Sequence, residues 1–514
     1  MGTSVFGKGV ARLCAVVATP NSREFARLVR LALQETPTVE LRLDWLASDR
    51  ERQNALRWLA RFASKRKPAF IATCRRRVGG GEFAGGAQQE LFWLQKAAQA
   101  GCAWCDLEIE TLRELPGKTV QDCGAPPRVL LSIHDFRRTP KLPAKLKLAA
   151  RNGVDAVKVA AMSRKLSDST RLLHLARGGS KVVAVPMGEI GLPARILALR
   201  EGSALLYAPV AAATAPGQVH LRDLKYLYRA HQLTHKTRVF GVIGNPVSHS
   251  LSPLLHNTGY IAAKKDSVFL PFLVEQLGEF LKVLGDFGLA GFSVTIPHKQ
   301  KIFDYLDECE PLAQQIGAVN TVTVRRNGKL AGSNTDYVGV LRSLENKLNL
   351  KSSRVLLFGA GGAARSAAFA MANSGAEILI CARRESAARQ LARAVHGSVI
   401  KRPALRKEEF DAILNSTPVG MYPHLDDSPL QPSELNCSLV MDLVYRPLQT
   451  KLLRIAAARR IRTVSGVEMF LAQGIAQWEL WMGSTAPSSA IRKAVLQALQ
   501  SEEHTSQNTS FRTK

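Results

Sequence analysis

Short apolar runs alternate with segments of helical periodicity from Leu13 to about Gln232. We interpret the apolar runs as strands: Leu13–Ala18, Thr38–Leu43, Ala69–Cys74, Ala103–Glu108, Val129–Ile133, Ala156–Ala160, Lys181–Val185 and Ala204–Tyr207. Helical patterns lie between most of them, for example at Ser22–Gln34, Gln88–Ala100 and Pro143–Arg151. Eight strands that alternate with helices predict a (β/α)8 barrel.

Polar residues fall at or near the carboxyl ends of these predicted strands. Glu40 and Arg42 are two residues apart on one strand and share a face. The other strands contribute Arg75, Glu108, His134 and Lys158. Barrel enzymes keep their catalytic residues at this end, and a buried unpaired charge costs several kcal/mol. The convergence therefore indicates a site, although periodicity alone leaves open a surface position for Lys158.

Four motifs in this half resemble type I 3-dehydroquinate dehydratases. They are Glu40-Leu41-Arg42-Leu43-Asp44, Ser132-Ile133-His134-Asp135-Phe136, Asp155-Ala156-Val157-Lys158-Val159-Ala160 and Ala215-Pro216-Gly217-Gln218. The resemblance implies that Lys158 forms an iminium with the substrate ketone and that His134 is the general acid and base. It also implies a substrate pocket made by Glu40, Arg42, Arg75, Arg195, Thr214, Ala215 and Gln218. Because only a neutral amine attacks a ketone, we expect a cationic pocket to lower the pKa of Lys158.

One position departs from the family pattern. Type I dehydratases usually carry a glutamate and two glycines after the arginine that matches Arg75, whereas this chain has Gly79 at the place of the glutamate. The change is expected to remove a negative charge near Arg75 and His134. Glu82 follows in a glycine-rich loop, so we hypothesise that it supplies part of the missing function. The alternative is that Glu82 is a solvated loop residue.

A nucleotide-binding pattern marks the second half of the chain. The predicted strand Arg354–Phe358 leads into Gly359-Ala360-Gly361-Gly362-Ala363-Ala364 and then a helix. Such a loop brings backbone N–H groups to a pyrophosphate, although a tight turn without a ligand has the same pattern. The next predicted strand, Glu377–Cys381, is followed by Arg383 and Arg384 instead of an acidic residue. Two arginines favour the 2′-phosphate of NADP, the alternative being a solvated basic loop.

Further motifs between about Arg238 and Gln500 resemble shikimate dehydrogenases. They include the run from Gly244 to Pro253, the run from Gly291 to Lys299, Ala318-Val319-Asn320-Thr321, Asn334-Thr335-Asp336, Asn415-Ser416-Thr417-Pro418, Asp442-Leu443-Val444-Tyr445 and the run from Gly466 to Gln473. An Asn327-Gly328 pair between Val322–Arg325 and Leu330 also predicts a hairpin.

This second resemblance implies reduction of 3-dehydroshikimate to shikimate with NADPH. It assigns Lys299 and Asp336 as the catalytic pair. The implied contacts to substrate are Ser248, Ser250, Thr295, Asn320, Tyr445 and Gln473. The implied contacts to cofactor are Gly359, Ala360, Gly361, Gly362, Ala363, Arg383, Arg384, Thr417, Leu443, Gly466 and Met469.

Composition narrows the function classes. The formal net charge is +28, but the basic residues are scattered, so we expect anionic small molecules and no nucleic-acid partner. No apolar run approaches the length of a membrane span, and the first residues lack a signal pattern, which predicts a cytoplasmic protein without a membrane partner. Cys102 and Cys105 lack a second pair, so buried, reduced thiols are expected and no metal site.

The predicted architecture is an α/β chain in which a barrel is followed by a two-domain dehydrogenase with a Rossmann-like domain. Its boundaries are 1–232 for the dehydratase barrel, 238–348 completed by 464–500 for the substrate-binding domain, 349–463 for the NADP-binding domain and 501–514 for a disordered tail. Two alternatives stay open on this scaffold: a quinate-directed catabolic enzyme and a non-catalytic quinate or shikimate sensor. The sequence does not predict the oligomeric state.

Overall fold

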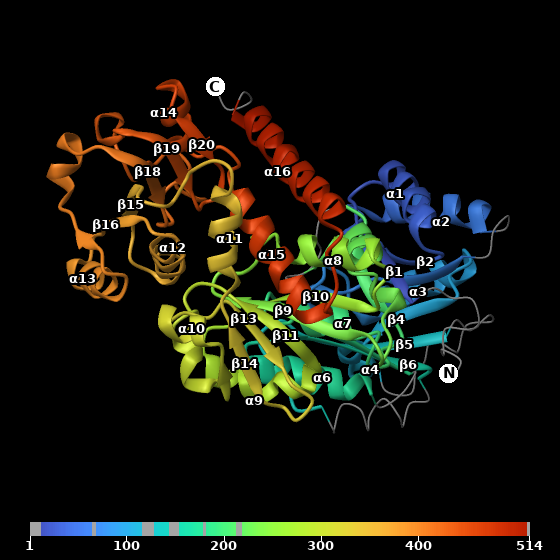
Figure 1. Cartoon of the computed structure of the whole chain (residues 1–514). Helices are drawn as coiled ribbons and strands as arrows, with labels where there is room; N and C mark the ends of the chain where they lie inside the picture. The colour runs from blue at the N-terminus through green and yellow to red at the C-terminus, as the bar shows by residue number, and fades with distance from the viewer. Residues whose placement is uncertain are drawn as a thin grey trace. The chain divides into compact units, whose positions relative to one another are not determined.

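The chain forms two compact units, one made of Met1–Arg238 with Pro271–Gly288 and the other of Val239–Leu270 with Leu289–Lys514. The computed structural model (Figure 1) describes residues 12–63, 68–115, 128–142, 154–177, 181–211 and 218–510, with side chains as far as residue 503. Among these residues, no helix combines the length and apolarity that crossing a membrane requires.

The first unit contains a parallel eight-stranded sheet with the order β7-β6-β5-β4-β3-β2-β1-β8. Its strands are β1 Leu13–Val17, β2 Thr38–Arg42, β3 Ala69–Thr73, β4 Trp104–Glu108, β5 Arg128–Asp135, β6 Ala156–Met162, β7 Val182–Met187 and β8 Leu206–Pro209. A backbone hydrogen bond from the N–H of Ala204 to the carbonyl of Val182 joins the two ends of the sheet. The prediction of an eight-stranded parallel barrel is therefore confirmed.

Helices alternate with these strands and bury one face against the sheet. They are α1 Ser22–Glu35, α2 Asp49–Ala63, α3 Ala87–Gln99, α4 Ile109–Glu114, α6 Leu166–Ala176 and α7 Leu192–Leu197, and the unit also includes α9 Leu277–Phe287. In α1 the buried residues Phe25, Leu28, Val29 and Ala32 recur at helical spacing. The helix predicted at Pro143–Arg151 lies outside the described residues.

A mixed six-stranded sheet has the order β10-β9-β11-β13-β14-β12. The strands are β9 Arg238–Gly244, β10 Ser267–Leu273, β11 Leu289–Val294, β12 Glu308–Cys309, β13 Thr321–Val324 and β14 Leu330–Ser333, with helices α8 Ser252–Ala262, α10 Pro311–Ile316 and α11 Thr335–Leu344. The predicted hairpin is confirmed, because β13 and β14 pair antiparallel with Val324 opposite Leu330. Gly328 in its turn has φ +83°, a conformation that favours glycine.

The second compact unit also contains a parallel six-stranded sheet. Its strand order, β17-β16-β15-β18-β19-β20, is the doubly wound Rossmann order. Its strands are β15 Arg354–Phe358, β16 Glu377–Cys381, β17 Ser398–Val399, β18 Phe410–Asn415, β19 Cys437–Asp442 and β20 Arg462–Val464. Helices α12 Gly362–Asn373, α13 Glu385–Ala394 and α14 Lys451–Ala458 connect them, and α15 Gly466–Met482 follows (Figure 1, orange to red).

The prediction of a disordered tail from Ser501 is wrong for its first part. Helix α16 spans Ser488–Ser510 and therefore continues through the start of the predicted tail. Glu502 on this helix forms an ion pair with Arg446, at 2.8 Å from Nε. A polar segment without an apolar face is held here by continuation of a packed helix and by this contact, neither of which composition reveals.

Candidate active sites

Lys158 lies inside the barrel, on β6. Its side chain is 3% exposed, and its Nζ contacts the carboxylate of Asp106 and, at 3.3 Å, Oε1 of Glu40. The ring of Tyr207 lies beneath it, with Nζ 4.7 Å from the ring centroid. The surface position that periodicity left open for this lysine is therefore excluded.

The expectation of a lowered pKa for Lys158 is wrong. Burial opposes the charged ammonium, but the negative charges of Asp106 and Glu40 outweigh burial and raise the pKa of Lys158 above its ordinary value. The arginines of the pocket would lower this pKa, but the contact with Asp106 is closer. This aspartate is 1% exposed and accepts hydrogen bonds from Ser132 on β5 and, at 3.3 Å, from Thr73 on β3, so both neighbouring strands hold its carboxylate in place.

His134, at the carboxyl end of β5, lines the same cavity as Lys158. Burial lowers the pKa of His134 well below its usual range, and the cations Arg75 and Lys158 add to the effect. The ring is therefore neutral near pH 7, as a general base must be. Its Nδ1 lies 2.9 Å from Oε2 of Glu108, and the other oxygen of Glu108 accepts a hydrogen bond of 2.8 Å from Nε of Arg75.

Most of the other predicted dehydratase residues line this cavity too, namely Glu40, Arg42, Arg75, Arg195 and Gln218. Arg42 is held by a two-pronged ion pair with the buried Asp44, at 2.9 Å from Nε and 2.6 Å from Nη2. Burial lowers the pKa of Arg195 to about 10. Thr214 and Ala215 lie outside the described residues.

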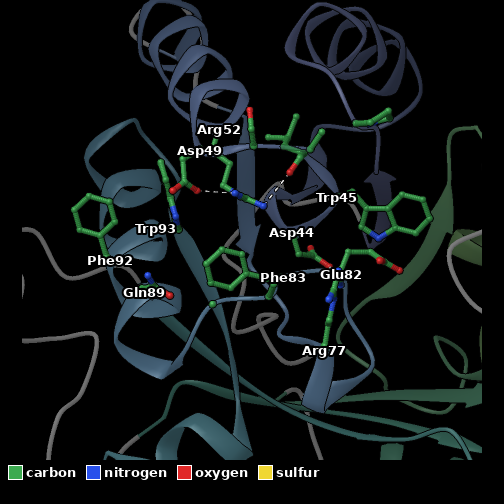
Figure 2. A pocket seen from close by; sticks show the side chains of 16 residues that line it. Asp44, Trp45, Asp49, Arg52, Arg77, Glu82, Phe83, Gln89, Phe92 and Trp93 are labelled. Atoms are coloured by element: carbon green, nitrogen blue, oxygen red, sulfur yellow. Dashed lines mark hydrogen bonds and ion pairs between the residues drawn. The ribbon is translucent and has the colours of Figure 1, made fainter.

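Glu82 lies away from the catalytic cavity. It lines a separate pocket of about 1020 Å³ at the barrel rim, together with residues such as Asp44, Trp45, Arg77 and Phe83. Figure 2 shows the exposed Glu82 side chain among these rim residues, on the side of Trp45 and Arg77. This position favours the alternative that Glu82 is a solvated loop residue. A negative charge is nevertheless present beside Arg75 and His134, because Glu108 contacts both.

The second site is built around Lys299 and Asp336. Nζ of Lys299 lies 2.5 Å from Oδ2 of Asp336, and Nδ2 of Asn320 donates to Oδ1 of the same carboxylate at 2.8 Å. Asp336 lies in the first turn of α11, where the helix dipole favours a carboxylate. Asn334 caps this helix by accepting a hydrogen bond from the N–H of Tyr337 at 3.1 Å. The carboxylate is thus fixed between a lysine and an amide.

Three of the other predicted substrate-binding residues, Ser250, Tyr445 and Gln473, form hydrogen bonds within the protein. Tyr445 is half-buried, partial removal from solvent raises the pKa of its hydroxyl, and this hydroxyl is hydrogen-bonded with Ser250. The ring of Tyr445 stacks on Phe470 at a centroid distance of 4.4 Å, and Gln473 donates to the carbonyl of Phe470 at 2.8 Å. The remaining two residues, Thr295 and Ser248, are half-buried after β11 and exposed after β9, respectively.

The glycine loop after β15 fits a bound dinucleotide. Gly359 has φ +121°, and a Cβ there would lie 2.4 Å from Oγ of Ser416, so only glycine suits this position. A Cβ on Gly361 would meet no atom within 4 Å, which leaves open space at the N-terminus of α12 for a pyrophosphate. Gly362 lies close to Lys299, because a Cβ added at position 362 would lie 3.2 Å from Cβ of Lys299.

Other cofactor candidates surround the carboxyl ends of the same sheet. Arg383 and Arg384 are exposed directly after β16, where a 2′-phosphate would lie. Thr417 donates to Asn415 at 2.7 Å at the end of β18. A Cβ on Gly466 would lie 2.6 Å from the carbonyl of Leu443, and Met469 lies one helical turn beyond Gly466 on α15. The donor set and the open glycine loop together fit NADP.

Comparison with known proteins finds relatives of both halves of the chain. Residues 13–235 match the family of type I 3-dehydroquinases, residues 242–322 match the shikimate dehydrogenase substrate-binding domain, and residues 466–496 match the shikimate 5'-dehydrogenase C-terminal domain. The bifunctional 3-dehydroquinate dehydratase/shikimate dehydrogenase of Arabidopsis thaliana, a chloroplastic protein, is 33% identical over 482 residues, which cover 87% of this chain and 78% of the plant protein.

The chain belongs to the family of bifunctional dehydroquinate dehydratase/shikimate dehydrogenases. Its second half is also 40% identical to the NADP-dependent shikimate dehydrogenase of Bacillus anthracis over 274 residues, which cover 51% of this chain and 99% of the bacterial protein. Among solved structures, the shikimate dehydrogenase of Thermus thermophilus with NADP(H) and shikimate is 33% identical, with a TM-score of 0.48 and coverage of 51% of this chain and 100% of that one.

Sequence reasoning missed Asp106 in this bifunctional chain and gave Glu108 no role. A signal for both was present, because Asp106 and Glu108 are two residues apart on one predicted strand and therefore share a face. That face points into the barrel, where the two carboxylates contact Lys158 and His134. Cys102 and Cys105 are buried, as predicted, and the described residues contain no cluster suited to a metal ion.

Proposed function

We propose that Lys158 and His134 dehydrate 3-dehydroquinate and that Lys299 and Asp336 serve the reduction of the product, 3-dehydroshikimate, to shikimate. The chain is thus a lyase and an NADP-dependent oxidoreductase in one polypeptide. The observation that carries the assignment is the pair of separate lysine-centred sites, one in the barrel and one beside the glycine loop of a Rossmann sheet.

In the barrel, the amine of Lys158 attacks the ketone of 3-dehydroquinate and loses water to form an iminium, which acts as an electron sink. Lys158 is protonated at rest, so it must first lose a proton, and Asp106 in contact with Nζ is positioned to accept it. His134 then removes the C2 proton and later returns a proton to the departing hydroxyl. Hydrolysis of the iminium releases 3-dehydroshikimate and restores the amine.

In the second site, NADPH supplies the hydride when it is bound. Lys299 donates a proton to the alkoxide that develops on the substrate ketone, since its ammonium is held by Asp336 at 2.5 Å. Asp336 orients this ammonium and binds the neighbouring hydroxyl. Polar side chains such as Asn320, Tyr445 and Ser250 suit a polyol, because a site built to bind a hydroxyl rejects analogues that lack it.

A one-pot assay of the full chain tests the proposal. With 3-dehydroquinate and NADPH, shikimate should form with loss of NADPH absorbance, whereas without NADPH the reaction should stop at 3-dehydroshikimate. A Lys158→Ala variant should give no shikimate from 3-dehydroquinate but normal turnover of added 3-dehydroshikimate. A chain that binds these ligands without converting either one would be a sensor, and the proposal would be wrong.

Quinate is the matched alternative substrate. The hydrogen bond between Ser250 and Tyr445 supports shikimate, because it places two hydroxyl groups where substrate oxygens are expected. The kcat/KM for shikimate oxidation with NADP should exceed that for quinate with either NADP or NAD, and the reverse order would identify a quinate-directed enzyme. The proposed location is the cytoplasm, and a tagged full-length chain tested by fractionation would check it.

A further inference from the structure

Gly79 follows β3 in the short helical turn Arg77–Gly79, beside the dehydratase cavity. A Cβ at this position would lie 3.4 Å from Oε2 of Glu108 and 3.5 Å from Cγ of Arg75, which are ordinary contact distances. The side chain of a glutamate at 79 would therefore begin in contact with the Glu108 carboxylate. Position 79, where the family has a glutamate, is therefore adjacent to the side chain of Glu108 at the end of β4.

Glu108 is positioned by the sheet. It is the last residue of β4 and pairs with Ser132 on β5, so its side chain projects on the same face as that of His134, two residues beyond Ser132. Its side chain is 2% exposed and both of its oxygens are used, one by Nδ1 of His134 at 2.9 Å and the other by Nε of Arg75 at 2.8 Å. A buried carboxylate with two such partners is held in one orientation.

The contact decides which nitrogen of His134 acts on the substrate. A carboxylate only accepts hydrogen bonds, so Nδ1 carries the hydrogen and Nε2 keeps its lone pair. The same carboxylate holds Arg75, which keeps the guanidinium from turning toward the ring. We propose that Glu108 is the positioning residue of the dehydratase half, orienting both His134 and Arg75, and this rests on the proposed function of His134.

The first test replaces Glu108 by glutamine in the full-length chain. Dehydration should lose about 10²-fold or more in kcat, because an amide can present its N–H to Nδ1 and favour the wrong tautomer. The substrate should still become attached to Lys158 on borohydride treatment, since the amine is not held by Glu108. Shikimate dehydrogenase turnover of the same preparation, measured with added 3-dehydroshikimate, should be unchanged and reports that the protein is folded.

The second test is rescue from position 79. Gly79 has no positive φ and has room for a Cβ, so Gly79→Glu can bring a carboxylate next to the side chain at position 108. In the Glu108→Gln background this substitution should recover at least tenfold in dehydratase kcat, whereas Gly79→Gln should recover none. Glu82→Gln is the matched control for a nearby glutamate outside the cavity and should leave kcat and KM unchanged.

The pH profile provides a readout that a purely structural role would not move. Gly79→Glu in the native background places a second carboxylate beside His134, which stabilises the imidazolium, so the acid limb of the kcat profile should shift to higher pH. The proposal is overturned if Glu108→Gln keeps kcat within threefold of the native value, if Gly79→Glu gives no rescue, or if the acid limb does not move. If Glu108→Gln proves too unstable to assay, the proposal is tested by the shift of the acid limb of the kcat profile in the single variant Gly79→Glu.

Discussion

Nζ of Lys299 lies 2.5 Å from Oδ2 of Asp336, although the two residues come from different elements, the loop after β11 and the first turn of α11. Asn320 holds the other oxygen of that carboxylate. The barrel lysine Lys158 contacts carboxylates of its own, Asp106 and Glu40. Two independent lysine sites allow each reaction to be tested separately in one chain.

Replacing Lys299 by alanine or Asp336 by asparagine should lower the reductase kcat by about 10²-fold or more, the usual contribution of a positioned proton donor. Dehydration of 3-dehydroquinate, followed at the absorbance of the enone product, should change little. Parallel loss of both activities would point to misfolding, and the assigned roles would then lack support.

Lys158 should carry the covalent intermediate. Borohydride added in the presence of 3-dehydroquinate should increase the mass of the peptide that contains Lys158, and Lys158→Ala should abolish both the label and dehydration. A label on any other lysine would contradict the assignment.

Replacing Asp106 by asparagine should change the pH dependence of this labelling. The charges of Asp106 and Glu40 raise the pKa of Lys158, and attack needs the neutral amine, so native trapping should increase as pH rises toward that pKa. Asp106→Asn removes one of these charges, so the pH at which the trapping rate rises should be lower in this variant. Initial rates of trapping across a pH series give the measurement, and a rise at the same pH would show that Asp106 does not control the amine.

Arg383 and Arg384 should select NADPH over NADH. Replacing both by glutamine should raise KM for NADPH far more than KM for NADH, because only NADPH carries the 2′-phosphate. Arg389→Gln is a suitable control, since Arg389 lies on the following helix and is bonded to Glu385. Equal effects on the two cofactors would mean that the pair belongs to a solvated basic loop.

Two glycines of the nucleotide loop should respond differently to alanine. Gly359→Ala should destabilise the second unit by about 1 kcal/mol or more, because the backbone has φ +121° and the added Cβ meets Ser416. Gly361→Ala should leave thermal unfolding unchanged, since its Cβ enters open space, but should weaken NADPH binding there. Unfolding curves and cofactor titrations measure the two effects, and equal destabilisation by both variants would contradict this geometry.

Most strands and the candidate catalytic residues could be predicted from local patterns in the amino-acid sequence. Strand bounds from Leu13 to Tyr207 came within a few residues of the observed ones, because strands buried in a parallel barrel are continuous apolar runs. The Rossmann loop could also be predicted from the sequence, because the backbone conformation at Gly359 is one that residues other than glycine avoid. Motif spacing then pointed to Lys158, His134, Lys299 and Asp336.

Only the tertiary structure decided the electrostatics of the barrel site. The shift in the pKa of Lys158 depends on Asp106, which is 52 residues away in the chain and reaches the amine only through the pairing of β4, β5 and β6. Glu82 is close to Gly79 in sequence but faces the rim, whereas Glu108 is distant in sequence and contacts His134. Charge interactions depend on distances in space, and those distances are set by strand register, which no local pattern records.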